Sequence, residues 1–119
     1  MDFSVSLKSN KIFRRLYSRG RSAVSPYMVL YCRQNGSAGN RLGITVSTKL
    51  GGAVRRNRIR RRIRETYRLN EYRLAKGWDI VIVARSAAVK GDFKEIEAEF
   101  IRLSEKLGIL NEKGIDCTD

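Results

Sequence analysis

The chain has 119 residues, a formal net charge of +13 and 42% hydrophobic residues. That length supports one modest hydrophobic core, so we expect a single domain over residues 1–119, and the positive charge favours nucleic acid over a membrane as its partner. The sequence contains no apolar run near the roughly 18 residues that would span a bilayer, and its N-terminus lacks the pattern of a signal peptide, so no membrane partner is expected.

Residues that usually carry out catalysis or hold a metal are scarce. The sequence contains no histidine, which removes the commonest general base and the usual zinc ligand, and it has no phosphate-loop or dinucleotide-binding motif. Cys32 and Cys117 are far apart and lack metal-ligand spacing, which favours reduced thiols and a cytoplasmic protein. We therefore expect no catalytic residue in the protein acting alone.

The first part of the chain predicts one helix and three strands. Residues 1–8 read as an irregular, flexible lead, and a helix is predicted from residue 10 to about residue 18, ending at Gly20. Residues 27–33 alternate between two sides, with Tyr27, Val29 and Tyr31 on one of them, and residues 41–47 alternate between apolar and small or polar residues. Strands are predicted over residues 21–24, 27–33 and 41–47, with a Gly/Asn-rich hairpin connection at residues 34–40.

Two rows of side chains run along the predicted first helix. Ile12 and Leu16 make one row, and Phe13 and Tyr17 make the row beside it. One interpretation buries all four side chains in the core. The other places Phe13 and Tyr17 at the border of a groove, where their rings can stack on bases.

The most distinctive stretch is residues 49–68, KLGGAVRRNRIRRRIRETYR. Seven of the ten residues from Arg55 to Arg64 are arginine, and no proline or glycine occurs between residues 53 and 76. This predicts a helix from about residue 53 to about residue 72. A narrow apolar stripe on that helix is formed by Ile59, Ile63 and Tyr67.

Cationic side chains flank this stripe on both sides, with Glu65 as the single acidic residue among them. A solvated helix face ordinarily mixes charges of both signs, so the crowding favours a polyanion as the partner. A basic solubility helix and a DNA recognition helix are two other interpretations. We favour RNA, because a guanidinium group suits phosphates and base edges and also stacks on unpaired bases.

The last part of the chain predicts a strand and a helix. Residues 80–84, IVIVA, are apolar without alternation, as in a strand covered on both faces. Asp92 and Glu95 form a capping-box pattern for a final helix that ends at Gly108, and residues 109–119 are expected to fray. The order α-β-β-β-α-β-α predicts an α+β fold, an α/β sandwich with one mixed sheet of about four strands. Spacing alone favours a right-handed βαβ crossover.

Residues 51–65, GGAVRRNRIRRRIRE, resemble a signature of the protein component of bacterial ribonuclease P. The signature reads Gly-x-Ala-Val-x-Arg-Asn-x-x-(Lys/Arg)-Arg. Residues 41–51 resemble the family's strand before this helix, and residues 12–20 resemble its first helix. Tyr31 stands where the family has an aromatic residue on the adjoining strand, whereas Thr48 stands where the family often has lysine.

The resemblance implies a left-handed crossover and a role in transfer RNA maturation. The ribonuclease P holoenzyme is an endoribonuclease that removes the 5′ leader of precursor transfer RNA, with its catalytic centre and Mg²⁺ in an RNA subunit. The implied partners are that RNA subunit and the precursor. The RNA subunit is then expected to contact Lys49, Arg55, Arg56, Asn57, Arg58, Arg60, Arg61, Arg64 and Arg68. The leader is expected to contact Phe13, Tyr17, Tyr31 and Thr45.

Three other functions fit parts of the same sequence. A structural RNA-binding protein of the ribosome or its assembly would explain the charge and the fold without needing a leader cleft. A DNA-binding regulator would want a helix-turn-helix pair, whereas the arginine helix here is bracketed by predicted strands. A protein-only nuclease lacks a credible set of catalytic residues.

Overall fold

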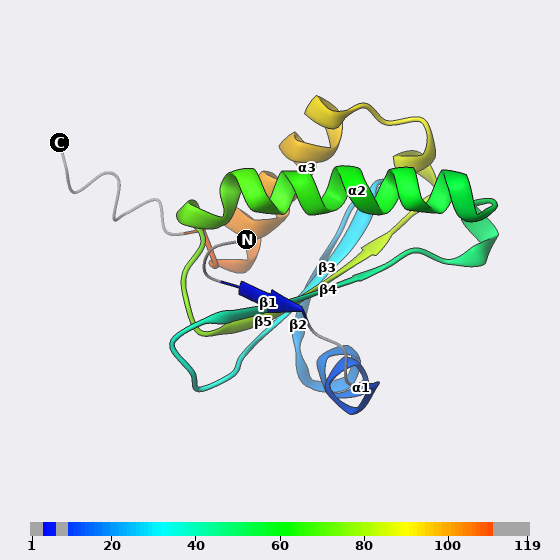
Figure 1. Ribbon diagram of the computed structural model, residues 1–119. Coiled ribbons are helices and arrows are strands. Elements are labelled where there is room, and N and C mark those ends of the chain that lie inside the picture. Colours follow the sequence, from blue (N-terminus) through cyan, green and yellow to red (C-terminus); the bar gives the residue numbers. More distant parts are fainter. Residues whose placement is uncertain (1–3, 7–9, 111–119) are drawn as a thin grey trace, which may run out of the picture.

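The structure is a computed structural model, and it describes residues 4–6 and 10–110. A single five-stranded sheet carries helices on both of its faces (Figure 1). The strands are β1 (Ser4–Ser6), β2 (Arg21–Val24), β3 (Met28–Gln34), β4 (Asn40–Thr45) and β5 (Trp78–Ala84). The α-helices are α1 (Asn10–Arg19), α2 (Ala53–Asn70) and α3 (Phe93–Leu107). Three short 3-10 helices are η1 (Thr48–Leu50), η2 (Glu71–Arg73) and η3 (Ser86–Val89).

The strands lie in the order β1-β4-β5-β3-β2. β4 and β5 are parallel neighbours joined through α2, which confirms the predicted βαβ unit. β3 runs antiparallel to β5 on its other side, so the sheet is mixed as expected. The left-handed sense of the crossover stays a prediction from the family resemblance.

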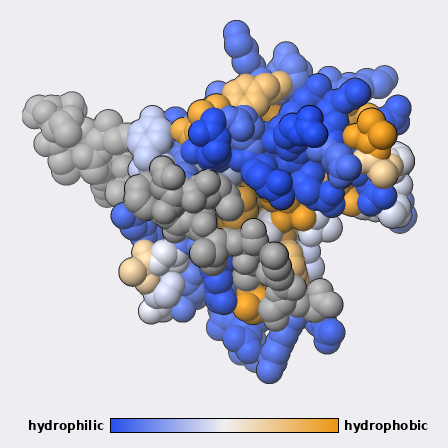
Figure 2. Space-filling model, in the orientation of Figure 1, coloured by the Kyte–Doolittle hydropathy of each residue, from blue (hydrophilic) through white to orange (hydrophobic). Residues whose placement is uncertain are grey.

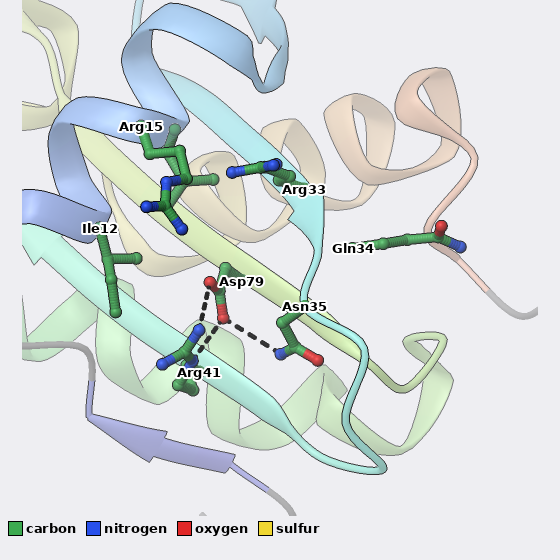
Figure 3. Close-up of a pocket in the computed structure, with 8 residues that line it drawn as sticks. Ile12, Arg15, Arg33, Gln34, Asn35, Arg41 and Asp79 are labelled. Carbon is green, nitrogen blue, oxygen red and sulfur yellow. Dashed lines mark hydrogen bonds and ion pairs between the residues drawn. The ribbon is translucent and has the colours of Figure 1, made fainter.

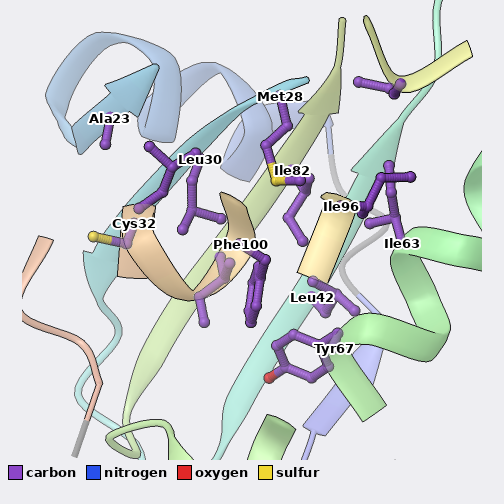
Figure 4. Close-up of a cluster of buried hydrophobic side chains, with 14 of the residues drawn as sticks. Ala23, Met28, Leu30, Cys32, Leu42, Ile63, Tyr67, Ile82, Ile96 and Phe100 are labelled. Atoms are coloured by element: carbon purple, nitrogen blue, oxygen red, sulfur yellow. The ribbon is translucent and has the colours of Figure 1, made fainter. Parts of the chain in front are cut away.

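The main core lies between the sheet and the helices α2 and α3 (Figure 4). The predicted apolar stripe of α2 packs into it, since Ile59, Ile63 and Tyr67 are all at most 1% exposed. From α3, Phe100 meets Tyr67 edge to face, with ring centroids 6.2 Å apart. Burying one narrow stripe of α2 leaves the rest of that helix facing outward.

A smaller apolar cluster fixes α1 on the opposite face of the sheet. Leu16 of α1 and Val81 of β5 are fully buried there, and Ile12, Phe13, Tyr31 and Val83 pack around them. β5 is therefore covered on both faces, because Ile80 and Ile82 enter the main core while Val81 meets α1. This confirms the interpretation of its unbroken apolar run.

The ends of α3 follow the predicted local chemistry. Asp92 accepts a hydrogen bond from the main-chain N–H of Glu95 over 2.8 Å, and the Glu95 carboxylate accepts from the main-chain N–H of Asp92 over 3.0 Å. Gly108 ends the helix with φ of +75°, a left-handed conformation that glycine adopts without strain. No helix in the described part of the chain has the length and apolar character to cross a membrane.

Three sequence expectations need correction. The segment expected to be an irregular lead contains β1, which pairs in parallel with residues 40–42 of β4. The segment expected to fray begins with Ile109, which is fully buried, and Leu110, which forms a bridge with Leu74. Tyr27 was expected on the same side of its strand as Tyr31, but it packs against the main core, and its hydroxyl donates to Glu95 Oε2 over 2.9 Å.

Candidate nucleic-acid interface

A tight turn leads from β4 into the arginine helix. Ser47 caps η1 by accepting a hydrogen bond from the Lys49 main-chain N–H over 3.1 Å. Gly51 then adopts φ of +135°, and a Cβ atom there would lie 2.5 Å from Arg55 Cδ. Because glycine has no Cβ atom, the chain can turn tightly at Gly51 and lie close to the first turn of α2. This turn places Lys49 beside the start of that helix.

The outward sides of α2 carry the predicted RNA-subunit residues. Hydrophilic side chains predominate over this helix in Figure 2. The exposed members of the set are Lys49, Arg55, Asn57, Arg58, Arg61, Arg64 and Arg68. Arg56 and Arg60 are half-buried. We use the name cationic flank for the exposed arc from Asn57 through Arg61 and Arg64 to Arg68.

Little negative charge offsets this flank. Arg68 donates to Glu65 from Nε over 3.1 Å and also from Nη2, and this hydrogen bond holds the pKa of the Glu65 carboxyl below its ordinary value. Arg60 Nη1 donates to Asn57 Oδ1 over 3.3 Å. The side chains of Arg61 and Arg64 have no hydrogen bond or ion pair to any residue that the structure describes. Their charges are available to an outside anion.

Two other arginines of α2 point elsewhere. Arg62 Nη1 donates to the main-chain oxygen of Gly91 over 2.8 Å, which ties the helix to the segment before α3. Arg56 Nε is buried and finds no hydrogen-bond partner within the described chain. The sequence pattern of α2 gave no sign of the contact between Arg62 and Gly91.

A shallow hollow beside α1 brings together three of the four predicted leader residues. It is lined by Phe13, Arg14, Tyr17 and Thr45. Tyr17 is 43% exposed, and its ring centroid lies 6.3 Å from that of Phe13. This arrangement favours the groove interpretation of the Phe13 and Tyr17 row over complete burial.

Tyr31 has a different place from the one expected. It does not line the hollow but supports it from β3, where its ring meets Tyr17 edge to face. Arg14 lines the hollow although it was not among the predicted leader residues. The sequence could have indicated Arg14 as a leader residue, because it lies next to Phe13 in an exposed turn of α1.

The cationic flank and this hollow lie on opposite faces of the sheet, since α2 and α1 cover different sides (Figure 1). The chain between them is short. Thr45 ends β4 in the hollow, and Lys49 stands at the approach to α2 only four residues later. One continuous segment therefore connects the two candidate surfaces.

The described residues provide little for metal or thiol chemistry. No group of three or more His, Cys, Asp or Glu side chains lies together in residues 4–6 and 10–110. Cys32 is a free, fully buried thiol, and burial raises its pKa. Cys117 lies outside the described residues.

Comparison with known proteins identifies the family. The family model described as Ribonuclease P matches residues 1–108. A ribonuclease P protein component from Clostridium botulinum (strain Langeland) is 44% identical over 88% of this chain and 96% of its own length. One from Alkaliphilus oremlandii is 38% identical over 88% of this chain and 92% of its own length.

Solved structures agree with this result. The ribonuclease P protein of Staphylococcus aureus superposes with a TM-score of 0.81 at 33% identity, covering 89% of this chain and 97% of that one. The protein from Thermotoga maritima gives a TM-score of 0.75 at 33% identity, covering 82% and 92% respectively. By sequence and by fold, the chain belongs to the ribonuclease P protein family.

Proposed function

We propose that the cationic flank of α2 binds the RNA subunit of ribonuclease P, and that the hollow beside α1 binds the 5′ leader of precursor transfer RNA. The observation that carries this proposal is the pair Arg61 and Arg64. Both are exposed on a helix that packs against the sheet, and neither side chain has a partner within the described chain. Such guanidinium groups can exchange their hydrogen bonds to water for stronger, charge-assisted hydrogen bonds to a phosphate.

The work of the flank is neutralisation of phosphates and local recognition. Each arginine presents a planar fork of N–H donors that matches phosphate oxygens. Asn57 can donate to and accept from a base or a ribose hydroxyl, because its amide carries both kinds of group. Arg55, Arg56, Arg58 and Arg60 extend the positive potential around these contacts, with Lys49 at the start of the helix.

The work of the hollow is stacking. Phe13 and Tyr17 offer ring faces and edges, and Arg14 offers a charge beside them. Stacking on an aromatic ring contributes about 1–3 kcal/mol per base and depends little on sequence. A subunit that receives many different leaders needs this tolerance.

The hydrolytic step then belongs to the RNA subunit. We assign Mg²⁺ to the RNA on the resemblance to the family, and the protein positions the substrate for a cut that the RNA makes. The free, buried Cys32 thiol supports a cytoplasmic location for this activity.

Crosslinking tests the assignment directly. A photoreactive group placed in the Arg55–Arg68 segment of the protein in cells should capture one main RNA, the ribonuclease P RNA, which sequencing of the crosslinked RNA identifies. Predominant capture of ribosomal RNA would instead support a role in the ribosome. Protein purified free of RNA should not cleave precursor transfer RNA, and robust cleavage by such protein would contradict a catalytic centre made of RNA.

A further inference from the structure

A second hollow lies on the same face of the sheet as the leader hollow, but it shares no lining residue with it. Its volume is about 160 Å³ (Figure 3). Arg15 comes from α1, Arg33 from β3 and Arg41 from β4, while Asp79 comes from β5. These three guanidinium groups and one carboxylate give the hollow a net positive charge.

The carboxylate of Asp79 already accepts three hydrogen bonds. It is 6% exposed, and it accepts from Arg41 Nε and Arg41 Nη2, each over 2.7 Å. Asn35 Nδ2 also donates to it over 3.1 Å. The pair therefore holds the Arg41 side chain in one orientation. Because a guanidinium has five N–H donors, Arg41 keeps three for another acceptor.

Arg15 and Arg33 remain without a counter-charge. In Figure 3 the Arg33 side chain extends from β3 toward Arg15, and the guanidinium group of Arg15 points from α1 toward the side of Asp79. Neither guanidinium group has a hydrogen bond or ion pair within residues 4–6 and 10–110. Like charges that line one hollow repel one another, and an anion bound between them offsets the repulsion.

We propose that this second hollow binds a phosphate group of an RNA backbone, with Arg15 and Arg33 as its two open cations and Arg41 as a donor oriented by Asp79. The proposal deepens the proposed function and rests on it for the identity of the RNA. Arg41 and Thr45 project from the same face of β4, four residues or about 13 Å apart. A strand of RNA in the leader hollow can therefore reach the second hollow.

The first experiment uses the protein alone, with inorganic phosphate as the probe. The Nε–Hε signals of arginine in ¹⁵N spectra should shift and saturate on titration. Arg15→Ala with Arg33→Ala should weaken that binding about tenfold or more, because hydrogen bonds to charged groups are lost. The matched control is Arg19→Ala with Lys94→Ala, which removes two exposed charges outside both hollows and should leave the affinity unchanged.

Arg33 is half-buried, so a loss of phosphate binding in the double variant could also come from a folding defect. A single variant separates these two causes. Arg15→Ala changes only an exposed side chain, and it should give a partial loss of phosphate affinity with an unchanged melting temperature. Equal phosphate affinity in the wild type and the double variant would overturn the proposal, as would an equal loss in the control.

Two further measurements distinguish the source of the phosphate. If it belongs to the RNA subunit, the double variant should lower the salt slope of RNA-subunit binding by about 0.7–0.9 per lost contact. If it belongs to the leader, the variant should reduce the preference of the holoenzyme for precursor over mature transfer RNA, with RNA-subunit binding unchanged. Phosphate binding lost without a change in either measurement would overturn the assignment to RNA. The Nε–Hε signal of Arg41 reports on the second hollow separately from the arginines of α2, so a failure of the proposed function would leave this result readable.

Discussion

Tyr17 and Tyr31 meet edge to face, with ring centroids 4.9 Å apart and an angle of 69° between the ring planes. Tyr31 is half-buried on β3, whereas Tyr17 of α1 is 43% exposed. The inner ring therefore supports the outer one and restricts its motion. A base that stacks on Tyr17 meets a ring that is already ordered, so less conformational entropy is lost on binding.

Replacement of the Tyr17 ring should affect the binding of precursor and mature transfer RNA differently. We expect Tyr17→Ala to weaken holoenzyme binding of leader-bearing precursor by about fivefold to a hundredfold, the equivalent of one lost stacking contact. Binding of mature transfer RNA should not change. Tyr17→Phe keeps the ring and should bind both RNAs as the wild type does. Equal weakening for both RNAs in Tyr17→Ala would mean that Tyr17 serves only the fold.

The cationic flank should control the salt dependence of RNA-subunit binding. Arg61→Ala with Arg64→Ala should lower affinity and reduce the slope of log affinity against log salt by roughly 0.7–0.9 per lost phosphate contact. Binding isotherms between low and moderate salt measure this slope. Lys94→Ala with Lys106→Ala removes two exposed charges from α3 and is the matched control. A slope that the α2 substitutions leave unchanged would show that the cationic flank does not contact the RNA subunit.

The apolar stripe of α2 should contribute to stability rather than to RNA contact. Ile63 is 1% exposed, so Ile63→Ala should lower the free energy of unfolding by about 2–5 kcal/mol through lost burial and a residual cavity. Arg64→Ala, at the next position, should stay within about 0.5 kcal/mol of the wild type. Urea denaturation of both variants checks this contrast. A large loss of stability in Arg64→Ala would show that this arginine supports the fold.

Acid should weaken two ion pairs on the helices. Hydrogen bonds from Arg68 and Arg102 lower the pKa values of Glu65 and Glu99 below their ordinary value. A carboxylate with a lowered pKa stabilises the folded state above its unfolded pKa, and this contribution is lost as the pH falls through the folded pKa. The melting temperature should therefore drop between about pH 5 and pH 3. Glu65→Gln with Glu99→Gln should show a smaller drop over this range, and an identical drop would contradict the assignment.

Long periodic segments allowed most of the fold to be predicted. The stripe of Ile59, Ile63 and Tyr67 placed α2, and the capping pattern of Asp92 and Glu95 placed the start of α3. β1 was missed because three residues are too few for alternation to be recognised. The burial of Ile109 was missed because it depends on its surroundings in the fold, beyond the end of the helical pattern.

The candidate site was predictable where it follows one helix, and less so where several elements meet. Exposure of Arg61 and Arg64 follows from their angle to the buried stripe. The support of Tyr17 by Tyr31 depends on how α1 crosses the sheet, which its sequence does not determine. The second hollow combines residues from α1, β3, β4 and β5, so no local pattern could bring Arg15, Arg33 and Asp79 together.

The two outermost strands of the sheet are also its shortest, with three residues in β1 and four in β2. An open sheet border is a template on which another chain can add a strand, and a short border offers few free main-chain donors and acceptors. A copy of the protein that has not yet met its RNA therefore presents little for edge-to-edge aggregation, and the repulsion of like-charged molecules acts in the same direction.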